Sequence, residues 1–378
     1  MSRRAFLADR IFDGTLLHDV AAVLTDGGRV LAIVPQSDVP ADVQKTALGA
    51  GIVTPGFVDL QVNGGGGRLF NNAPDVQTLR MMARAHGRSG ATSIVPTLIT
   101  DAPEVVEAAV DAAVEACQNV EGVAGLHLEG PHLDARRKGA HDAALIRPMT
   151  DADLRFYRAA AARLPMLKIT LAPAAASASQ IAALAEAEVL VSLGHAEARY
   201  EDVAAAAQAG ARCVTHLFNA MSQVEGRHPG VAGAALTLTG LSAGIIADGI
   251  HVHPANLALA AGVMGDRLFL VSDAMAVAGS DATEFTLNGR RILRGQGRLT
   301  LEDGTLAGAD LDLPTAVAVM VGQAGVPLAQ ALAMATRIPA DLIGRGDLGR
   351  LTPGSRADFA LLSSDLAVRQ VWRGATLI

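Results

Sequence analysis

Several short apolar runs in this chain end on a side chain that can bind a metal or move a proton. VLVSLGH ends on His195, CVTHLFNA carries His216, and LHLEGP and LFLVSDA carry Glu129 and Asp273. A short apolar run bounded by turn residues is typical of a parallel strand covered on both faces. In a (β/α)8 barrel the carboxyl ends of such strands share one face, which carries the active site. We therefore predict an α/β fold with a (β/α)8 barrel of the TIM type.

Eight such runs alternate with alanine-rich helical stretches, as expected of a parallel sheet with crossover helices. The runs are IVTPGFVDLQV, SIVPT, GLHLE, LKITLAP, VLVSLGH, CVTHLF, AGIIAD and LFLVSDA. We assign residues 55–345 to the barrel and expect a β-hairpin insertion around 283–304, where Asn288-Gly289 predicts a type I′ turn. The two ends of the chain, residues 1–54 and 346–378, contain short segments in which apolar and polar residues alternate. They are expected to pair into one small, discontinuous β-sandwich domain.

The overall charge excludes several classes of partner. The 378-residue chain has a net charge of −7, whereas nucleic acids and anionic membranes bind basic surfaces. No run approaches the ~18 apolar residues of a membrane span. The segment Ser2–Leu7 resembles a twin-arginine export signal, but Asp9 and Asp13 interrupt the apolar stretch that such a signal needs. With two cysteines and no disulfide framework, the chain is expected to be cytoplasmic.

The strand-end residues have the chemistry of a catalytic metal site. One carboxylate and two imidazoles, here Glu129, His195 and His216, are a common ligand set for catalytic zinc and leave a position open for water. A lone histidine is more often a hydrogen-bonded core residue, but three such residues on one barrel face favour a metal. Asp273 is then placed to take a proton from the metal-bound water and pass it to a leaving amine.

A family resemblance rests on motifs spread from Pro55 to Gly308. PGFVDLQVNG, LHLEGPHL, KGAH, SLGHA, THLFNAM, GRHPG, IIADGIHVHP, VSDAM and TLAG together resemble the N-acetylglucosamine-6-phosphate deacetylases of the amidohydrolase superfamily. The tail LGRLTPGSRADFALL is similar to the C-terminal strand segment of that superfamily. The resemblance implies metal-dependent hydrolysis of N-acetyl-D-glucosamine 6-phosphate to D-glucosamine 6-phosphate and acetate, in amino-sugar catabolism and cell-wall recycling.

The resemblance also implies a role for each site residue. Glu129, His195 and His216 would hold one divalent metal, zinc first and otherwise Fe²⁺, Co²⁺ or Mn²⁺. Asp273 would move the proton, and His141 would polarise the acetamide carbonyl. The sugar phosphate would be surrounded by Asn219, Ala220, Arg227 and His251, with Asp248, Gly249 and Ile250 in the same wall. Ala140, beside His141, and Leu306, Ala307 and Gly308 would close over the sugar. In similar enzymes the GRHPG arginine reaches across a dimer interface, so we expect a homodimer with Arg227 contributed by the partner.

The residues at the end of the first predicted strand indicate how many metal ions the site binds. Barrel amidohydrolases with two metals carry a His-x-His pair there, whereas this chain has Gln61 and Asn63, and amides bind divalent cations poorly. The His-x-His pattern at 251–253 follows the seventh strand instead, and His253 is expected to start a helix before Pro254. One tight metal is therefore predicted.

Three alternatives stay open at this point. The galactosamine epimer would use the same phosphate and acetyl contacts. A dihydroorotase-like or aminoacylase-like amidohydrolase usually carries the first-strand His-x-His pair and often a carboxylated lysine in place of Glu129. A catalytically silent binding barrel has no need of all three metal ligands together with Asp273.

Overall fold

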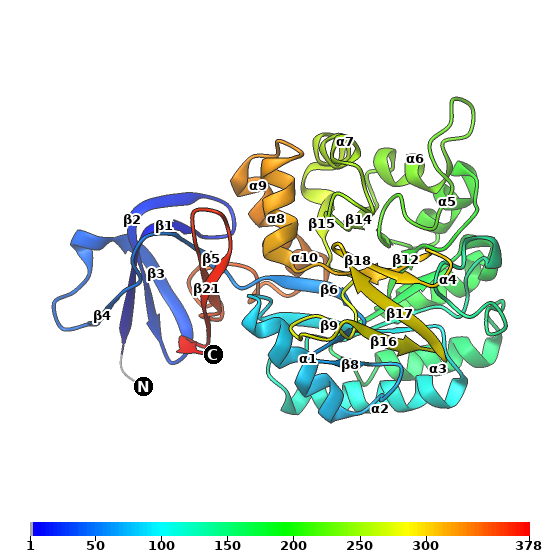
Figure 1. Cartoon of the computed structure of the whole chain (residues 1–378), viewed down its shortest axis with the longest axis horizontal. Helices are drawn as coiled ribbons and strands as arrows, with labels where there is room; N and C mark the ends of the chain where they lie inside the picture. Colours follow the sequence, from blue (N-terminus) through cyan, green and yellow to red (C-terminus); the bar gives the residue numbers. More distant parts are fainter. Residues whose placement is uncertain (1–2) are drawn as a thin grey trace.

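The eight predicted barrel strands are all present in the computed structural model, which describes residues 3–378 (Figure 1). The strands are β6 (Val58–Val62), β9 (Ser93–Ile99), β10 (Leu126–Glu129), β11 (Leu167–Leu171), β12 (Leu190–Leu193), β13 (Cys213–Val214), β14 (Ser242–Ile245) and β15 (Leu268–Leu270). They pair in chain order into one parallel sheet whose strands are buried on both faces. The barrel prediction is confirmed.

The sheet closes where the segment after β15 returns to β6. A parallel bridge joins Val62 to Ala274, and the Asp273 amide donates to the Gln61 carbonyl at 3.1 Å. The first predicted run, IVTPGFVDLQV, is two strands rather than one. β5 (Ile52–Pro55) belongs to another sheet, where Pro55 is its last paired residue, and β6 begins only at Val58, after Gly56 and Phe57.

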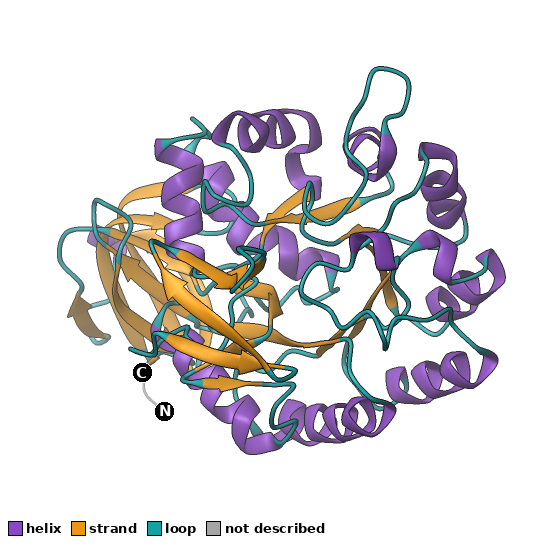
Figure 2. Cartoon of the chain, turned by 45° about the vertical axis from the view of Figure 1, so that its right-hand side comes forward, coloured by secondary structure: helices purple, strands orange, loops and turns teal. Residues whose placement is uncertain are grey.

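Helices surround the barrel strands on the outside (Figure 2). They are α1 (Val76–Arg88), α2 (Pro103–Asn119), α3 (Asp151–Ala161), α4 (Ala178–Glu186), α5 (Tyr200–Gln208), α6 (Gly230–Thr237), α7 (Pro254–Met264), α8 (Leu313–Gly322), α9 (Leu328–Ala335) and α10 (Arg337–Leu342). Asp75 caps α1 and Thr150 forms a capping box at α3, which satisfies free helix N–H groups. Within residues 3–378 no helix is long and apolar enough to cross a membrane.

Strands from both chain ends lie side by side in a second sheet, left of the barrel in Figure 1. It contains β1 (Arg4–Phe12), β2 (Leu17–Asp26), β3 (Arg29–Pro35), β4 (Gln44–Ala47), β5, β20 (Phe359–Leu362), β21 (Val368–Arg373) and β22 (Thr376–Leu377). Phe359 stacks on Trp372 in its core and Phe6 packs edge-on against both, with ring centroids 4.9–5.9 Å apart. Ser2, the first residue of the export-like segment, lies outside the described residues, and the domain boundaries at 54 and 346 stay predictions.

A four-stranded antiparallel sheet follows the eighth barrel strand. It consists of β16 (Glu284–Leu287), β17 (Arg290–Gly295), β18 (Arg298–Leu301) and β19 (Leu306–Ala309). Asn288 and Gly289 both have positive φ, as a type I′ turn requires. A bridge from Ala309 to Ala274 returns the chain to the barrel. A shorter ribbon, β7 (Gly64–Gly65) with β8 (Arg68–Leu69), lies beyond the first barrel strand. Both additions lie beyond the carboxyl ends of strands that carry candidate site residues.

Candidate active site

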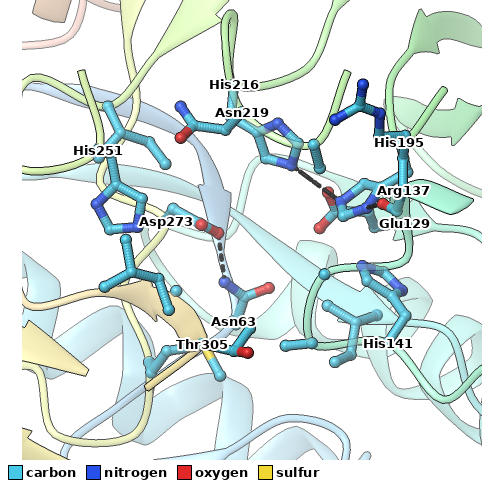
Figure 3. Close-up of a pocket in the computed structure, with 18 of the residues that line it drawn as sticks. Asn63, Glu129, Arg137, His141, His195, His216, Asn219, His251, Asp273 and Thr305 are labelled. Atoms are coloured by element: carbon cyan, nitrogen blue, oxygen red, sulfur yellow. Dashed lines mark hydrogen bonds and ion pairs between the residues drawn. The ribbon is translucent and has the colours of Figure 1, made fainter. Parts of the chain in front are cut away.

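The strand-end residues meet in one pocket of about 380 Å³ at the carboxyl end of the barrel (Figure 3). Most of the predicted site residues line it. They are Glu129, Ala140, His141, His195, His216, Asn219, Ala220, His251, Asp273, Leu306 and Gly308. The pocket therefore gathers predicted residues that lie up to 179 positions apart in the chain, from Glu129 to Gly308.

Three of the polar residues in this pocket are held in an unfavourable backbone conformation. His195, His216 and Asp273 have φ values of 46°, 33° and 49°, in the left-handed region that non-glycine residues seldom adopt. Such a residue costs on the order of 1 kcal/mol or more and persists only where its surroundings enforce it. Each of the three lies two or three residues after the end of a barrel strand, where the left-handed backbone turns the side chain into the pocket.

The side chains of Glu129, His195 and His216 converge on one point. The His216 Nε2 atom lies 3.0 Å from His195 Nε2 and 3.1 Å from Glu129 Oε1. His195 Nε2 lies 3.2 Å from the same carboxylate oxygen. All three side chains are at least nine-tenths buried, so three potential ligand atoms form a nearly equilateral triangle away from bulk water.

This triangle fits a divalent metal. An ion about 2.1 Å from each of three tetrahedral ligands places those ligands roughly 3.3 Å apart. The His195 Nδ1–H group donates to the Arg137 carbonyl at 2.8 Å, which leaves a lone pair on Nε2 toward the triangle. Two buried imidazole nitrogens and a carboxylate oxygen so close together need a cation or a proton between them.

Asp273 faces this cluster and receives hydrogen bonds from the first strand. Asn63 Nδ2 donates to Asp273 Oδ1 at 2.8 Å, and Gln61 Nε2 donates to the same oxygen at 3.2 Å. Gln61 Nε2 also lies 3.4 Å from both Glu129 oxygens. Burial, together with the Glu129 charge, raises the pKa of Asp273 above its ordinary value. The two amides at the His-x-His position thus contact the carboxylates directly.

His141 lies on the opposite side of the cluster. Its ring centroid is 4.4 Å from that of His195, and one of its ring nitrogens lies within 4.8 Å of ligand atoms of Glu129 and His195. His141 Nδ1 lies 2.8 Å from Thr100 Oγ1 and 3.4 Å from the backbone N–H of Thr100, which donates to it; an Nδ1 that accepts from Thr100 carries no proton, so the proton of the neutral ring is then on Nε2. Burial, followed by the charge of His195, lowers the pKa of His141 well below its ordinary value. A neutral ring with a proton on Nε2 can donate to a carbonyl oxygen.

The loop after the seventh strand supports His251. Asp248 accepts the backbone N–H groups of Ile250 and His251 at 2.8 and 2.7 Å, and its other oxygen accepts from His251 Nδ1 at 2.6 Å. Asp248, Gly249 and Ile250 therefore form a turn that holds His251 and do not themselves line the pocket. His253 caps α7 by accepting from the Ala255 N–H, which confirms its predicted place at a helix start.

Two further predicted residues are not in the pocket. Ala307 is fully buried in β19, between the lining residues Leu306 and Gly308. Arg227 lines a separate groove of about 650 Å³, to which Arg136 and Arg137 also contribute. Because Arg136 and Arg137 line both cavities, the groove adjoins the catalytic pocket. Within one chain, however, Arg227 does not join the other predicted phosphate contacts.

Sequence patterns did not indicate several lining residues. They are Asn63, Ile99, Arg136, Arg137, Gly139, Ile246, Met275, Leu287 and Thr305. The sequence indicates Asn63 only as a poor metal ligand, because its hydrogen bond to Asp273 depends on closure of the barrel. The ARR segment before KGAH was the available signal for Arg136 and Arg137. Arg137 acts here through its backbone carbonyl, which no side-chain pattern predicts.

Comparison with known proteins places this geometry in a family. The model of the amidohydrolase family matches residues 52–377. The chain belongs to the amidohydrolase family. One curated relative, the N-acetylgalactosamine-6-phosphate deacetylase of Shewanella sp. (strain ANA-3), is 39% identical to this amidohydrolase over 97% of the chain and 96% of its own length.

Solved structures agree with this assignment. The N-acetylglucosamine-6-phosphate deacetylase of Pasteurella multocida is 35% identical, with a TM-score of 0.96 over 100% of this amidohydrolase and 99% of that chain. An Asp-to-Ala variant of the Mycobacterium smegmatis N-acetyl-D-glucosamine-6-phosphate deacetylase, solved with N-acetyl-D-glucosamine-6-phosphate, is 32% identical with a TM-score of 0.92, over 100% and 99%. The amidohydrolase thus shares its whole fold with these enzymes.

Proposed function

We propose that this enzyme hydrolyses the acetamide of an N-acetyl amino-sugar 6-phosphate, with N-acetyl-D-glucosamine 6-phosphate as the first candidate. The products are D-glucosamine 6-phosphate and acetate, as amino-sugar catabolism and cell-wall recycling require. The observation that carries the proposal is the buried triangle of Glu129, His195 and His216 facing Asp273 in one pocket. The names of the full-length relatives supply the substrate class.

Glu129, His195 and His216 are proposed to hold one divalent ion. When bound, such an ion supplies a Lewis acid for the carbonyl oxygen and makes its water more acidic. Two nitrogens and one carboxylate oxygen suit zinc best, and Fe²⁺, Co²⁺ or Mn²⁺ would also fit. Gln61 and Asn63 support a single ion, since both amides donate to Asp273 through nitrogen.

Asp273 and His141 complete the proposed chemistry. Asp273 takes a proton from the attacking water, whose oxygen bonds to the acetyl carbon. Asp273 then delivers that proton to the sugar nitrogen as the C–N bond breaks. The raised pKa of Asp273 suits both steps. His141 donates its Nε2 proton to the acetyl oxygen, where negative charge develops.

The phosphate end of the substrate is proposed to lie toward Asn219, Ala220 and His251. Leu306 and Gly308 would cover the sugar on the opposite side. Because Arg227 lines the adjoining groove in its own chain, it is proposed to reach the phosphate of a partner subunit in a homodimer. Half of all residues are hydrophobic and only 18% are charged, which favours such an interface.

A second candidate substrate is N-acetyl-D-galactosamine 6-phosphate. The 39% identical Shewanella relative is named as a deacetylase of that substrate. The two substrates differ at C4, whereas the acetamide on which the metal ligands and Asp273 are proposed to act is at C2. The cytoplasm is the proposed location, which agrees with two unpaired cysteines, Cys117 and the buried Cys213.

Release of free amine tests the proposal. The purified enzyme is incubated with the two N-acetyl amino-sugar 6-phosphates and with unphosphorylated N-acetyl-D-glucosamine, before and after metal chelation. We expect fast, chelator-sensitive release from a phosphorylated substrate and slow release from the free sugar. Equal rates of amine release from the phosphorylated and the unphosphorylated sugar would contradict the proposed phosphate site. No release from metal-loaded enzyme would reject the proposed substrates, and a natively folded protein that binds no metal would favour a silent barrel.

A further inference from the structure

A second cavity, distinct from the catalytic pocket, lies where the barrel meets the terminal sheet. It has a volume of about 570 Å³ and is lined by α1, the end of α2 and the last strands of the chain. Its lining residues are Arg80, Ala83, Arg84, Arg88, Asn119, Val120, Glu121, Arg373 and Ile378. Four of these are arginines, and Glu121 is the one acidic side chain among them.

Three of the arginines form a stripe along one helix. Arg80, Arg84 and Arg88 are spaced four residues apart on α1, so they share a face over about 12 Å of helix axis. Within residues 3–378 none of the three is in an ion pair or a side-chain hydrogen bond. In a chain with a net charge of −7, such a run of uncompensated cations in a concave site favours an anionic ligand.

Arg373 adds a fourth guanidinium group from the other domain. Its Nη2 atom donates to the Thr92 carbonyl at 3.2 Å, whereas its buried Nε has no partner within the described part of the chain. Gly87 and Gly122 make room for it, since a Cβ atom at either would lie 3.0 or 2.7 Å from Nη2. The chain thus accommodates a half-buried arginine without giving it a full set of acceptors.

Local helix stability explains only part of this pattern. Arg88 lies in the last turn of α1, where a cation interacts favourably with the helix dipole. That effect fades within one turn, so it gives no reason for Arg80 and Arg84. Burial lowers the pKa of Arg373, while the charges of Asp358 and, to a smaller extent, Glu121 raise it. Glu121 is the one acidic side chain that lines the groove, so Arg80, Arg84 and Arg88 have no carboxylate partner there.

We propose that this groove binds a small anion that carries two or more phosphoryl groups. Planar guanidinium forks bind phosphate oxygens in pairs, and a stripe about 12 Å long is matched by two separated phosphoryl groups rather than one. The volume falls within the range of small-molecule sites. No aromatic side chain is among the described residues that line the groove, so recognition rests on the charged groups. This site is independent of the proposed deacetylation.

Calorimetric titration of the metal-loaded enzyme tests the site, with fructose 1,6-bisphosphate as the probe and inorganic phosphate for comparison. Each titration is run both without and with saturating glucosamine 6-phosphate, which fills the catalytic pocket. We expect Arg84→Ala and Arg88→Ala each to weaken binding at least about tenfold, because each removes a charge-assisted contact. Arg155→Ala, an exposed helix arginine outside the groove, and Arg227→Ala should leave the dissociation constant unchanged.

Other results would overturn the proposal. No binding of the bisphosphate to the wild type, or equal binding by Arg84→Ala, would show that the arginine stripe is only a solvated helix face. Binding that disappears with glucosamine 6-phosphate or in Arg227→Ala would place the probe in the catalytic pocket. Equal affinity for inorganic phosphate would reject recognition of two groups. Amine release in Arg84→Ala is measured separately, so failure of this site and failure of the proposed reaction are distinguished.

Discussion

Asp273→Asn separates proton transfer from every other role of this side chain. The asparagine oxygen can still accept from Asn63 Nδ2 and Gln61 Nε2, which lie 2.8 and 3.2 Å from Asp273 Oδ1. The positive φ of 49° is also tolerated, since asparagine enters the left-handed region more readily than most residues. The variant should therefore fold, keep the pocket and bind metal, while its amide can neither accept the proton of water nor return it.

We expect kcat for amine release to fall about 10²–10⁴-fold, which corresponds to roughly 3–5 kcal/mol of barrier. The KM and the bound metal, measured by elemental analysis, should change little. Asp101→Asn is the matched control, because Asp101 also follows a barrel strand and accepts from an asparagine at 2.8 Å but lies outside the catalytic pocket. A kcat within threefold of wild type in Asp273→Asn would refute the assignment, and a comparable loss in Asp101→Asn would attribute the effect to structural damage.

Three further predictions concern other residues. His216→Ala should lose the metal, whereas His141→Ala should keep it and lower kcat about 10²–10³-fold; elemental analysis with kinetics decides which histidine is the ligand. Arg227→Ala should raise KM roughly tenfold with little change in kcat, because a phosphate contact strengthens binding uniformly; a large loss of kcat alone would contradict this. Burial raises the pKa of Asp59 to about 7, so from about pH 4 to 7 the native state holds a proton that the unfolded state has lost. Stability should fall by up to about 4 kcal/mol as pH rises through that window, and Asp59→Asn should show a smaller difference in melting temperature between about pH 5 and pH 8.

The sequence by itself determined the barrel and the residues at its strand ends. Apolar runs and the polar residue that ends each one are local patterns, so Glu129, His195, His216 and Asp273 could be placed without contacts. The fixed geometry of parallel strands then brings their carboxyl ends to one face. The same local logic predicted the type I′ turn at Asn288-Gly289 and the helix start at His253.

Tertiary structure decided what those side chains contact. Asn63 and Asp273 are 210 positions apart, and their hydrogen bond exists because the last strand closes on the first. The Arg137 carbonyl that orients His195 belongs to the backbone, which carries no sequence signal of its own. The groove containing Arg227, and the one joining α1 to Arg373, depend on how separate elements pack. Strand identity is a local property of the chain, whereas ligand geometry and charge compensation are properties of residues that only folding brings together.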